Sequence, residues 1–338
     1  MKNIAILGST GSIGQQTLDV IRANPNKFRV VALSAGNNRE LLARQAAEFA
    51  PSLVTSLPES PLPVAIHPDA DLVVCAIVGN AGLEPTIAAI NAGKPVALAN
   101  KETLVCAGER IMALAREKGV DILPIDSEHY AVSECLRGRS PQEVSKIILT
   151  ASGGALFGKS RSELENVTPA DALAHPNWRM GAKITVDSAT LMNKALEVIE
   201  AHHLFDVPFD KIEVVIHRES IIHSMVEFTD GSIIAHLAMP DMRLPIHAAL
   251  AHPEKAGNSP AQIPRINFAE LGKLTFYPPD RSTFECLQLG IDAGKKGGKF
   301  PEIMNNANEE AVALFLAGEL KFLDIPRYIR EKLNENGF

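Results

Sequence analysis

Short apolar runs alternate with segments of helical periodicity along the first third of the chain. Residues 4–7 form an apolar run, a Gly/Ser/Thr-rich turn follows, and apolar positions then recur with helical spacing up to Asn24-Pro25. This order repeats to residue 125 and predicts a doubly wound, Rossmann-like α/β domain. Further strands are predicted at 28–33, near 53, and at 72–78, 95–99 and 122–125, with helices at 39–49, 83–91 and 103–118.

The pattern changes after Asp126. Apolar runs at 146–150, 183–186, 212–216, 221–228 and 232–237 predict strands, and one strong helix is predicted over 189–203. Asp230-Gly231 separates two alternating runs, which predicts a hairpin. We therefore expect a central α+β domain with a mostly antiparallel sheet, followed by a Pro/Gly/Asn-rich linker and an α-helical C-terminal domain with helices at 284–292, 302–317 and 326–333. The predicted boundaries are 1–126, 127–252, the linker 253–282, and 283–338.

Composition and charge narrow the class of protein. The 338 residues exceed what one hydrophobic core usually serves, which favours two or three domains. A formal charge of −7 supplies no global positive field, so we expect no nucleic-acid and no membrane partner. The four cysteines are far apart with no C-x-x-C pair, which argues against a disulfide framework or a thiolate zinc site. Without a leader or a membrane-spanning stretch, the sequence predicts a soluble, cytoplasmic enzyme.

Gly8, Gly11 and Gly14 form a glycine-rich loop directly after the first predicted strand and before a helix. Such a loop lets backbone N–H groups approach a pyrophosphate at the positive end of the helix, and Thr10 and Ser12 add hydroxyl donors. A tight turn without a ligand is the alternative. After the second strand, Ser34 to Arg39 contains no carboxylate, although an NAD enzyme normally offers one to the ribose. Neutral amides beside Arg39 favour NADPH over NADH, unless these residues only cap the next helix.

Acidic residues gather at the end of the last predicted strand of the first domain. Asp126 and Glu128 are two apart, so on an extended segment their carboxylates share one face. On the predicted helix, Asn193 and Lys194 are four and three residues before Glu197, which places the three side chains on one patch. Carboxylates without His or Cys favour Mg²⁺ or Mn²⁺. The alternative is solvated strand-end charges and an ordinary helix ion pair.

Small and polar residues suggest a phosphate site. Ser152-Gly153-Gly154 follows an apolar strand, and Ser188 is placed to be the N-cap of the predicted helix from residue 189. Helix capping and turn formation are the alternative. The only tryptophan, Trp178, stands in a loop from His175 to Gly181 and serves either as a lid or as an anchor of that loop. Histidines in the alternating strands are interpreted as structural, and these are His217, His223 and His236.

Together these motifs resemble one enzyme family, and the resemblance covers essentially the whole chain. In chain order they are 8-GSTGSIG-14, 99-ANKE-102, 124-PIDSEH-129, 152-SGG-154, 175-HPNW-178, 186-VDSAT-190 with Asn193, Lys194 and Glu197, 223-HSM-225, 240-PDMR-243 and 306-NANE-309. The set is similar to that of the 1-deoxy-D-xylulose 5-phosphate reductoisomerases of the non-mevalonate isoprenoid pathway.

The resemblance implies NADPH- and divalent-metal-dependent reductive isomerisation of 1-deoxy-D-xylulose 5-phosphate to 2-C-methyl-D-erythritol 4-phosphate. It makes 1–126 the NADPH-binding domain and 127–252 the catalytic domain. The implied metal ligands are Asp126, Glu128 and Glu197, and the catalytic set adds Lys101 and His175. The implied substrate contacts are Lys101, Ser127, Glu128, Ser152, His175, Ser188, Asn193, Lys194 and Glu197. The implied cofactor contacts are Thr10, Gly11, Ser12, Ile13, Gly36, Asn37, Asn38, Asn100, Glu102 and Gly181, and the implied lid residues are Trp178 and Met180.

Two departures from the family pattern are visible. Asn37 stands where some members carry Lys, so recognition of the 2′-phosphate would rest on Asn38 or Arg39. Members usually extend several dozen residues beyond the equivalent of Leu333, so we expect a shortened C-terminal domain. The apolar strand at 221–225 and its neighbours favour a homodimer.

Two rival functions stay open on the residues alone. One is an NADPH-dependent dehydrogenase of the homoserine type, which needs no metal and carries out no isomerisation. The other is a dinucleotide-binding sensor or interaction protein without catalysis. Turnover that resists chelators would favour the first, and tight NADPH binding without turnover would favour the second.

Overall fold

The computed structural model describes residues 1–254 and 263–338, which divide into two compact units. The first unit comprises Met1–Tyr130 and Asp241–Arg265, and the second comprises Ala131–Pro240 and Ile266–Phe338. Part of the predicted linker, residues 255–262, lies outside the described residues. The three predicted domains with their boundaries stay a prediction.

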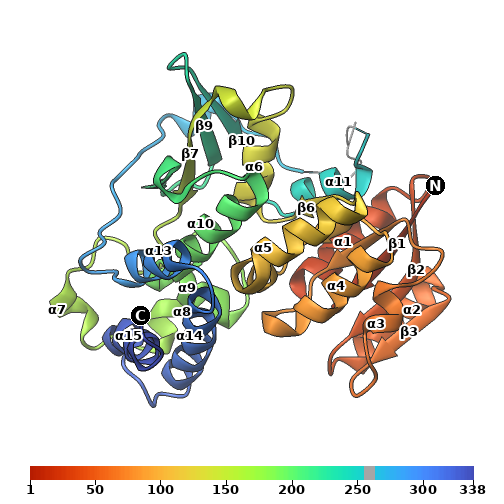
Figure 1. The fold of residues 1–338 in the computed structure, drawn as a ribbon, viewed down its shortest axis with the longest axis horizontal. Helices are drawn as coiled ribbons and strands as arrows, with labels where there is room; N and C mark the ends of the chain where they lie inside the picture. The colour runs from red at the N-terminus through yellow and green to blue at the C-terminus, as the bar shows by residue number, and fades with distance from the viewer. Residues whose placement is uncertain (255–262) are drawn as a thin grey trace. The chain divides into compact units, whose positions relative to one another are not determined.

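The first unit contains a six-stranded, entirely parallel sheet. Figure 1 labels its strands β1, β2, β3 and β6. The strand order is β3-β2-β1-β4-β5-β6. The first three strands are added toward one edge of the sheet and the last three toward the other edge, so the order reverses between β1 and β4. Doubly wound folds bind ligands in the crevice at this position. The Rossmann-like prediction is confirmed. The strands are β1 (Lys2–Leu7), β2 (Phe28–Ala35), β3 (Leu53–Ser56), β4 (Leu72–Cys75), β5 (Val96–Leu98) and β6 (Ile122–Pro124).

Helices cover this sheet through buried aliphatic side chains. Ile4 and Ile6 of β1 share one core with Leu18 of α1 and with Ile246 and Leu250 of α11, a helix from far along the chain. Fully burying each such side chain stabilises the fold by about 1.5–3 kcal/mol. The helices of the first unit are α1 (Ser12–Ala23), α2 (Arg39–Phe49), α3 (Leu62–Ala65), α4 (Leu83–Asn91), α5 (Lys101–Lys118) and α11 (Arg243–Ala251), and α6 (Ser127–Cys135) begins in it.

The second unit contains a four-stranded sheet of order β10-β9-β7-β8. The prediction of a mostly antiparallel sheet is not confirmed, because the sheet is mixed: β7 pairs antiparallel with β9 and parallel with β8. The predicted hairpin at Asp230-Gly231 is confirmed, since β9 and β10 pair antiparallel across it. The strands are β7 (Val144–Ala151), β8 (Ile212–Ile216), β9 (Ile222–Phe228) and β10 (Ile233–Leu237).

The helices of the second unit correct two predictions and confirm a third. Residues 183–186, predicted as a strand, lie in helix α9, and the predicted helix over 189–203 is split by Leu191, whose φ is 63°. The C-terminal helices are confirmed, and α13 packs against α10 (Figure 1). The helices are α7 (Arg161–Leu164), α8 (Pro169–Leu173), α9 (Ala182–Thr190), α10 (Met192–Phe205), α12 (Phe268–Leu271), α13 (Cys286–Lys296), α14 (Phe300–Leu316) and α15 (Ile325–Glu335).

Two further sequence predictions concern the cysteines and the membrane. None of the four cysteines is in a disulfide, in agreement with the absence of a C-x-x-C pair. In the part of the chain that the structure describes, no helix combines the length and apolarity needed to cross a bilayer.

Candidate active site

The loop between β1 and α1 requires glycine at its first position. Gly8 has a φ of +83°, and a Cβ atom there would lie 2.6 Å from the carbonyl oxygen of Ala76. Helix α1 begins at Ser12, and its N-cap, Gly11, has no side chain that could bond to the first-turn N–H groups. Exposed N–H groups at a helix N-terminus attract anions. This turn therefore fits a pyrophosphate, and it carries the predicted cofactor residues Thr10, Gly11, Ser12 and Ile13.

A side chain that the sequence analysis missed fixes this loop. Ser9 is buried, and its hydroxyl donates to Oε1 of Gln45 at 2.8 Å. Nε2 of Gln45 donates back to the carbonyl oxygen of Ser9 at 3.0 Å. The signal was present: Gln45 is a polar residue three positions after the buried Leu42, on the inner face of α2.

The segment after β2 partly serves to cap a helix. Oδ1 of Asn38 accepts the backbone N–H of Leu41 at 3.2 Å, so the capping alternative is confirmed for this residue. Arg39 donates to a backbone carbonyl in the segment after β3 at 2.5 Å. Gly36 and Asn37 are exposed. Their contacts with a cofactor stay predictions.

Asn100 connects the loop after β4 to the start of α5. Its Oδ1 accepts the backbone N–H of Thr103 at 2.8 Å, and its Nδ2 donates to the carbonyl oxygens of Ile77 and Gly79 at 2.6 and 2.8 Å. Asn100 is therefore a helix cap and a loop clamp together. Glu102, also predicted to contact the cofactor, stands in the first turn of the same helix.

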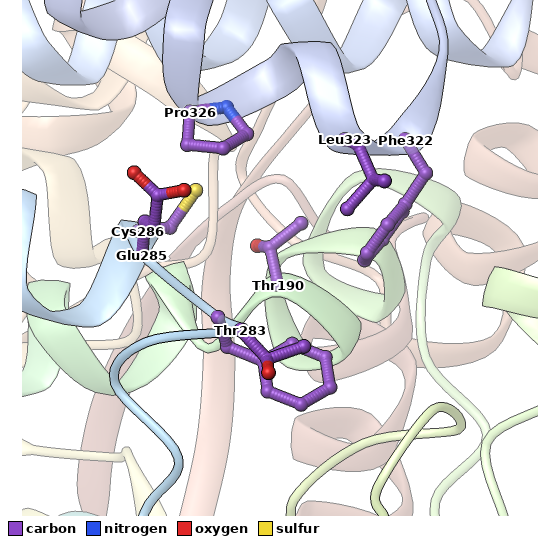
Figure 2. A pocket seen from close by; sticks show the side chains of 8 residues that line it. Thr190, Thr283, Glu285, Cys286, Phe322, Leu323 and Pro326 are labelled. Atoms are coloured by element: carbon purple, nitrogen blue, oxygen red, sulfur yellow. The ribbon is translucent and has the colours of Figure 1, made fainter. Parts of the chain in front are cut away.

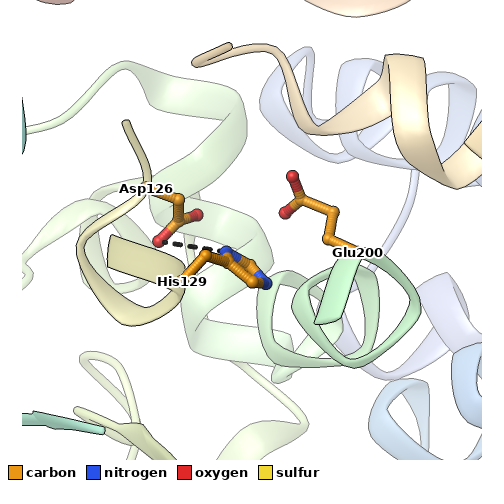
Figure 3. Close-up of side chains that lie close together, drawn as sticks. All are labelled: Asp126, His129 and Glu200. Carbon is orange, nitrogen blue, oxygen red and sulfur yellow. Dashed lines mark ion pairs between the residues drawn. The ribbon is translucent and has the colours of Figure 1, made fainter. Parts of the chain in front are cut away.

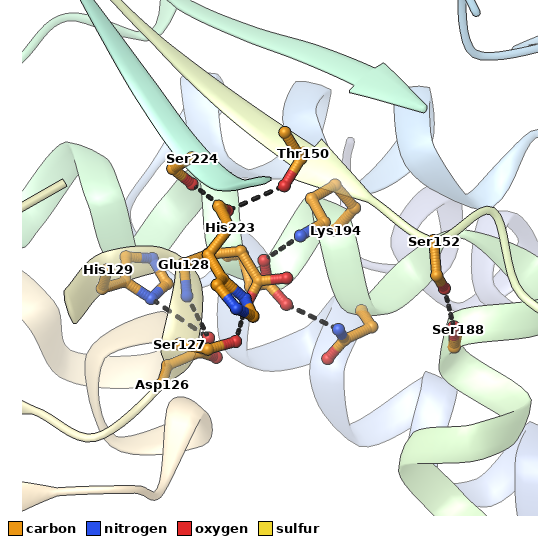
Figure 4. Close-up of polar contacts among 12 residues, drawn as sticks. Asp126, Ser127, Glu128, His129, Thr150, Ser152, Ser188, Lys194, His223 and Ser224 are labelled. Carbon is orange, nitrogen blue, oxygen red and sulfur yellow. Dashed lines mark hydrogen bonds and ion pairs between the residues drawn. The ribbon is translucent and has the colours of Figure 1, made fainter. Parts of the chain in front are cut away.

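Asp126 and Glu128 do not lie on a strand, which corrects the predicted geometry. Strand β6 ends at Pro124, and α6 begins at Ser127, so the chain has already turned into a helix. Oδ1 of Asp126 accepts the backbone N–H of Glu128 at 3.2 Å, and the hydroxyl of Ser127 donates to Oε2 of Glu128 at 2.6 Å (Figure 4). A helix start thus holds the two acidic residues close together in place of an extended segment.

The side chains of Lys101 and His129 lie beside the Asp126 carboxylate. Nζ of Lys101 donates to its Oδ2, and Nδ1 of the fully buried His129 lies 3.8 Å from its Oδ1 (Figure 3). Only 8% of the Asp126 side chain is exposed, and a carboxylate so deeply buried needs charged or hydrogen-bonding partners to stay ionised. Carboxylate oxygens held in this way are ligands of the kind that Mg²⁺ and Mn²⁺ prefer.

In the second unit, three predicted substrate residues lie together. The hydroxyl of Ser152 lies 2.8 Å from Nε2 of His175. It also lies 3.4 Å from the hydroxyl of Ser188 (Figure 4). The prediction that Ser188 is an N-cap is wrong. Ser188 lies near the C-terminal end of α9, whose N-cap is Gly181. The Ser152 loop packs tightly on this last turn: Gly154 has a φ of +68°, and a Cβ there would lie 2.5 Å from the Ser188 carbonyl oxygen.

His175 is a neutral ring in a defined tautomer. Its Nδ1 accepts the backbone N–H groups of Asn177 and Trp178 at 3.2 and 3.0 Å. The proton of the neutral ring is therefore on Nε2, which donates to the hydroxyl of Ser152. Burial, and after it the positive charge of Arg218, lower the pKa of His175 to about 4, so the ring is uncharged above that pH.

The loop that holds Trp178 is anchored to the sheet. The Trp178 ring packs edge-on against the His223 ring of β9, with centroids 6.3 Å apart, and Nε2 of His223 lies 3.2 Å from the carbonyl oxygen of Ala238. Trp178 and Met180 are half-buried. The anchor interpretation is thus favoured for this arrangement, and the lid role of both residues stays a prediction.

The spacing on α10 brings its three predicted residues together. Nδ2 of Asn193 donates to Oε1 of Glu197 at 2.6 Å, and Nζ of Lys194 donates to Oε2 (Figure 4). The Lys194 and Glu197 side chains are only 4% and 1% exposed. A buried ion pair often contributes little net stability because both charges lose their hydration. The burial of the Lys194–Glu197 pair therefore favours a chemical role over the alternative of an ordinary helix ion pair.

A second set of buried contacts, which the sequence did not predict, is formed by the neighbour of Ser188. This neighbour, Asp187, is 1% exposed, forms an ion pair with Lys183 at 2.8 Å and accepts Nδ2 of Asn308 at 2.8 Å. These contacts join α9 to α14. Asn308 belongs to the quoted motif at 306–309, so the signal was present without an assigned role.

A small pocket lies where α9 ends, close to α13 and α15 (Figure 2). Its Glu285 forms ion pairs with Arg161 at 3.0 Å and Arg330 at 2.7 Å, and burial raises the pKa of the neighbouring Cys286 thiol. None of its lining residues belongs to the predicted site. They are Thr190, Thr283, Phe284, Glu285, Cys286, Phe322, Leu323 and Pro326.

Three family models match successive parts of this chain. The model of 1-deoxy-D-xylulose 5-phosphate reductoisomerase matches residues 4–62 and 57–108, that of its C-terminal domain matches 122–205, and that of the DXP reductoisomerase C-terminal domain matches 237–337. The enzyme of that name from Geobacillus kaustophilus is 52% identical over 99% of this chain and 93% of its own length. The chain belongs to the 1-deoxy-D-xylulose 5-phosphate reductoisomerase family.

Solved reductoisomerase structures agree with this membership. A crystal structure of DOX-P reductoisomerase in complex with NADPH, fosmidomycin and magnesium is 40% identical with a TM-score of 0.94, covering 99% of this chain and 90% of that one. The reductoisomerase from Zymomonas mobilis in complex with NADPH is also 40% identical, with a TM-score of 0.90 and coverage of 99% and 92%. The family suggested by the sequence motifs is confirmed.

Proposed function

We propose that this protein converts 1-deoxy-D-xylulose 5-phosphate to 2-C-methyl-D-erythritol 4-phosphate, using NADPH and one divalent cation, Mg²⁺ or Mn²⁺. The observation that carries the proposal is the 52% identity to a named reductoisomerase along 99% of the chain. The local geometry of both units supplies groups that suit each part of this reaction.

The first unit supplies the NADPH site. The Gly8 turn, where a Cβ would clash with backbone, and the N-terminus of α1 suit the pyrophosphate. Gly36, Asn37 and Asn38 suit the adenosine half, and the remaining predicted contacts are Asn100, Glu102 and Gly181. Two related structures hold NADPH, which supports this assignment.

The cation ligands are Asp126, Glu128 and Glu197. Their donor chemistry fits Mg²⁺ or Mn²⁺, since all three are carboxylates and Asp126 and Glu197 are buried among polar partners. A bound cation would stabilise negative charge on substrate oxygens, and bound NADPH would supply the hydride. A related structure with magnesium supports the choice of metal.

The substrate's phosphate is held by Ser152, Ser188, Asn193 and Lys194. Neutral His175 donates to the hydroxyl oxygen of Ser152 and so orients the hydroxyl hydrogen toward the phosphate oxygens. Lys101 and Ser127 complete the substrate contacts. Trp178 and Met180 exclude water when the loop covers the substrate. A homodimer in the cytoplasm completes the proposal.

The test is NADPH oxidation with 1-deoxy-D-xylulose 5-phosphate after chelation, with and without added Mg²⁺ or Mn²⁺. We expect oxidation only with metal, and formation of the branched methylerythritol phosphate. Oxidation that resists chelation would favour a plain dehydrogenase. A folded, NADPH-binding protein with no turnover would favour the sensor function.

NADPH is expected to be preferred over NADH, because no carboxylate precedes Glu40 in the segment after β2 and Arg39 lies beside its amides. The measurement is the ratio of kcat/KM for the two nucleotides. Substituting Arg39→Ala should lower this ratio, whereas Arg29→Ala, an exposed arginine on β2, should leave it unchanged. A wild-type ratio that favours NADH would contradict the assignment.

A further inference from the structure

The turn between β8 and β9, residues 217–220, contacts two loops that the sequence analysis assigned to separate tasks. Nη1 of Arg218 donates to the carbonyl oxygens of Ser152 and Gly154 at 2.5 and 2.8 Å. Its guanidinium lies over the ring of Phe157, 4.8 Å from the centroid. One cationic side chain thus fixes the backbone on both sides of Gly153.

The same turn also holds the loop that carries Trp178. Nδ2 of Asn177 donates to the carbonyl oxygen of Arg218 at 2.6 Å and to the hydroxyl of Ser220 at 2.9 Å. The two loops meet through His175, whose ring donates to Ser152 and accepts the N–H groups of residues 177 and 178. The Ser152 loop, the Trp178 loop and the Arg218 turn therefore form a closed ring of hydrogen bonds.

Buried hydrogen bonds hold the turn at 217–220 in place, so it can fix the two loops that it contacts. His217 is fully buried, its Nδ1 lies 2.9 Å from the carbonyl oxygen of Thr275, and its Nε2 accepts the backbone N–H of Ile221. Glu219 accepts the hydroxyl of Thr275 at 2.7 Å. These contacts keep Ser220 at a φ of +52°, a backbone conformation that residues other than glycine rarely adopt.

We propose that Arg218 is a positioning residue for the substrate's phosphate: it fixes the Ser152–Gly154 loop from behind and ties the Trp178 loop to it. The inference rests on the proposed function, and it adds a residue that touches neither substrate nor cofactor. Its guanidinium contacts the backbone of the loop proposed to bind the phosphate, and a cation close to that loop favours a dianion. Burial lowers the pKa of Arg218, and the neighbouring Glu219 opposes that shift. A guanidinium is basic enough to stay charged at neutral pH in proteins.

The test compares Arg218→Met with Arg218→Lys. Methionine keeps an apolar stem against Phe157 but removes the charge and both hydrogen bonds, so KM for 1-deoxy-D-xylulose 5-phosphate should rise at least about tenfold, more than kcat falls. Lysine restores a cation and donors, and it should recover part of that loss. Arg161→Met is the matched control, because Arg161 is exposed and pairs with Glu285 in the same unit. An unchanged KM in a folded Arg218→Met protein would overturn the inference.

A second measurement needs no turnover. Trp178 is the only tryptophan, so its fluorescence reports on its loop directly. Titration with inorganic phosphate should change the wild-type emission, and Arg218→Met should shift the midpoint at least about tenfold upward. Equal midpoints, or no response in the wild type, would overturn the inference. A wild type that fails to convert 1-deoxy-D-xylulose 5-phosphate would overturn the proposed function, and the titration would still decide for or against Arg218.

Discussion

Replacing Glu197 by glutamine is expected to lower kcat about 100- to 1000-fold, which corresponds to roughly 2.7–4 kcal/mol of transition-state stabilisation. The reason is that the substitution removes one of the three carboxylates proposed to hold the cation while leaving the size of the side chain unchanged. The glutamine oxygen can still accept from Asn193 or from Lys194, so much of the local packing is kept. Activity should therefore fall far more than the unfolding temperature.

The measurement is kcat at saturating Mg²⁺ together with a thermal unfolding curve. Glu213→Gln is the matched control: Glu213 lies on β8 in the same unit, is 54% exposed and pairs with Lys146, so its replacement should leave kcat near the wild-type value. Near-normal turnover of Glu197→Gln at saturating Mg²⁺ would refute the metal assignment. A Mg²⁺ titration of Glu197→Gln should also show a higher Mg²⁺ concentration for half-maximal activity than the wild type.

The parallel sheet could be predicted because buried parallel strands are short apolar runs separated by helices. The run at 183–186 shows where that signal fails. Lys183-Ile-Thr-Val186 is rich in β-branched residues, which favour strands, yet it lies in α9. There the hydroxyl of Thr185 donates to the carbonyl oxygen of Gly181 one turn earlier, and Val186 is fully buried. Tertiary packing has overridden local propensity.

Contacts among the candidate site residues were predictable wherever those residues are close in sequence. The three-and-four spacing on α10 alone places Asn193 and Lys194 against Glu197. Contacts between distant segments were not predictable, because a single sequence contains no signal for which segments meet. Arg218 reaches a carbonyl 66 residues earlier, and Asn308 reaches a carboxylate 121 residues earlier. Arg218 holds the loop of Ser152, whose role a local motif had indicated, whereas Asn308 holds Asp187, to which no motif had given a role.

Replacing Lys194 by alanine is expected to raise KM for 1-deoxy-D-xylulose 5-phosphate about 10- to 100-fold, with a smaller fall in kcat. A hydrogen bond to a charged group contributes roughly 1.5–3 kcal/mol, and this ammonium is proposed as the cation of the phosphate site. Because Lys194 also pairs with the buried Glu197, its loss should lower the free energy of unfolding as well, by about 3 kcal/mol. Steady-state kinetics and urea unfolding measure the two effects separately.

A double variant, Lys194→Met with Glu197→Gln, distinguishes the loss of phosphate affinity from the loss of stability. Removing both charges leaves no unpaired buried ion, so stability should recover toward the wild-type value. Phosphate affinity should not recover, since the ammonium is still absent, and a titration with inorganic phosphate followed by Trp178 fluorescence would show this without turnover. Lys295→Ala is the control, because Lys295 is half-exposed and pairs with Asp210 at the surface. An unchanged KM in Lys194→Ala would mean that the phosphate is held elsewhere and that the buried pair serves Glu197 alone.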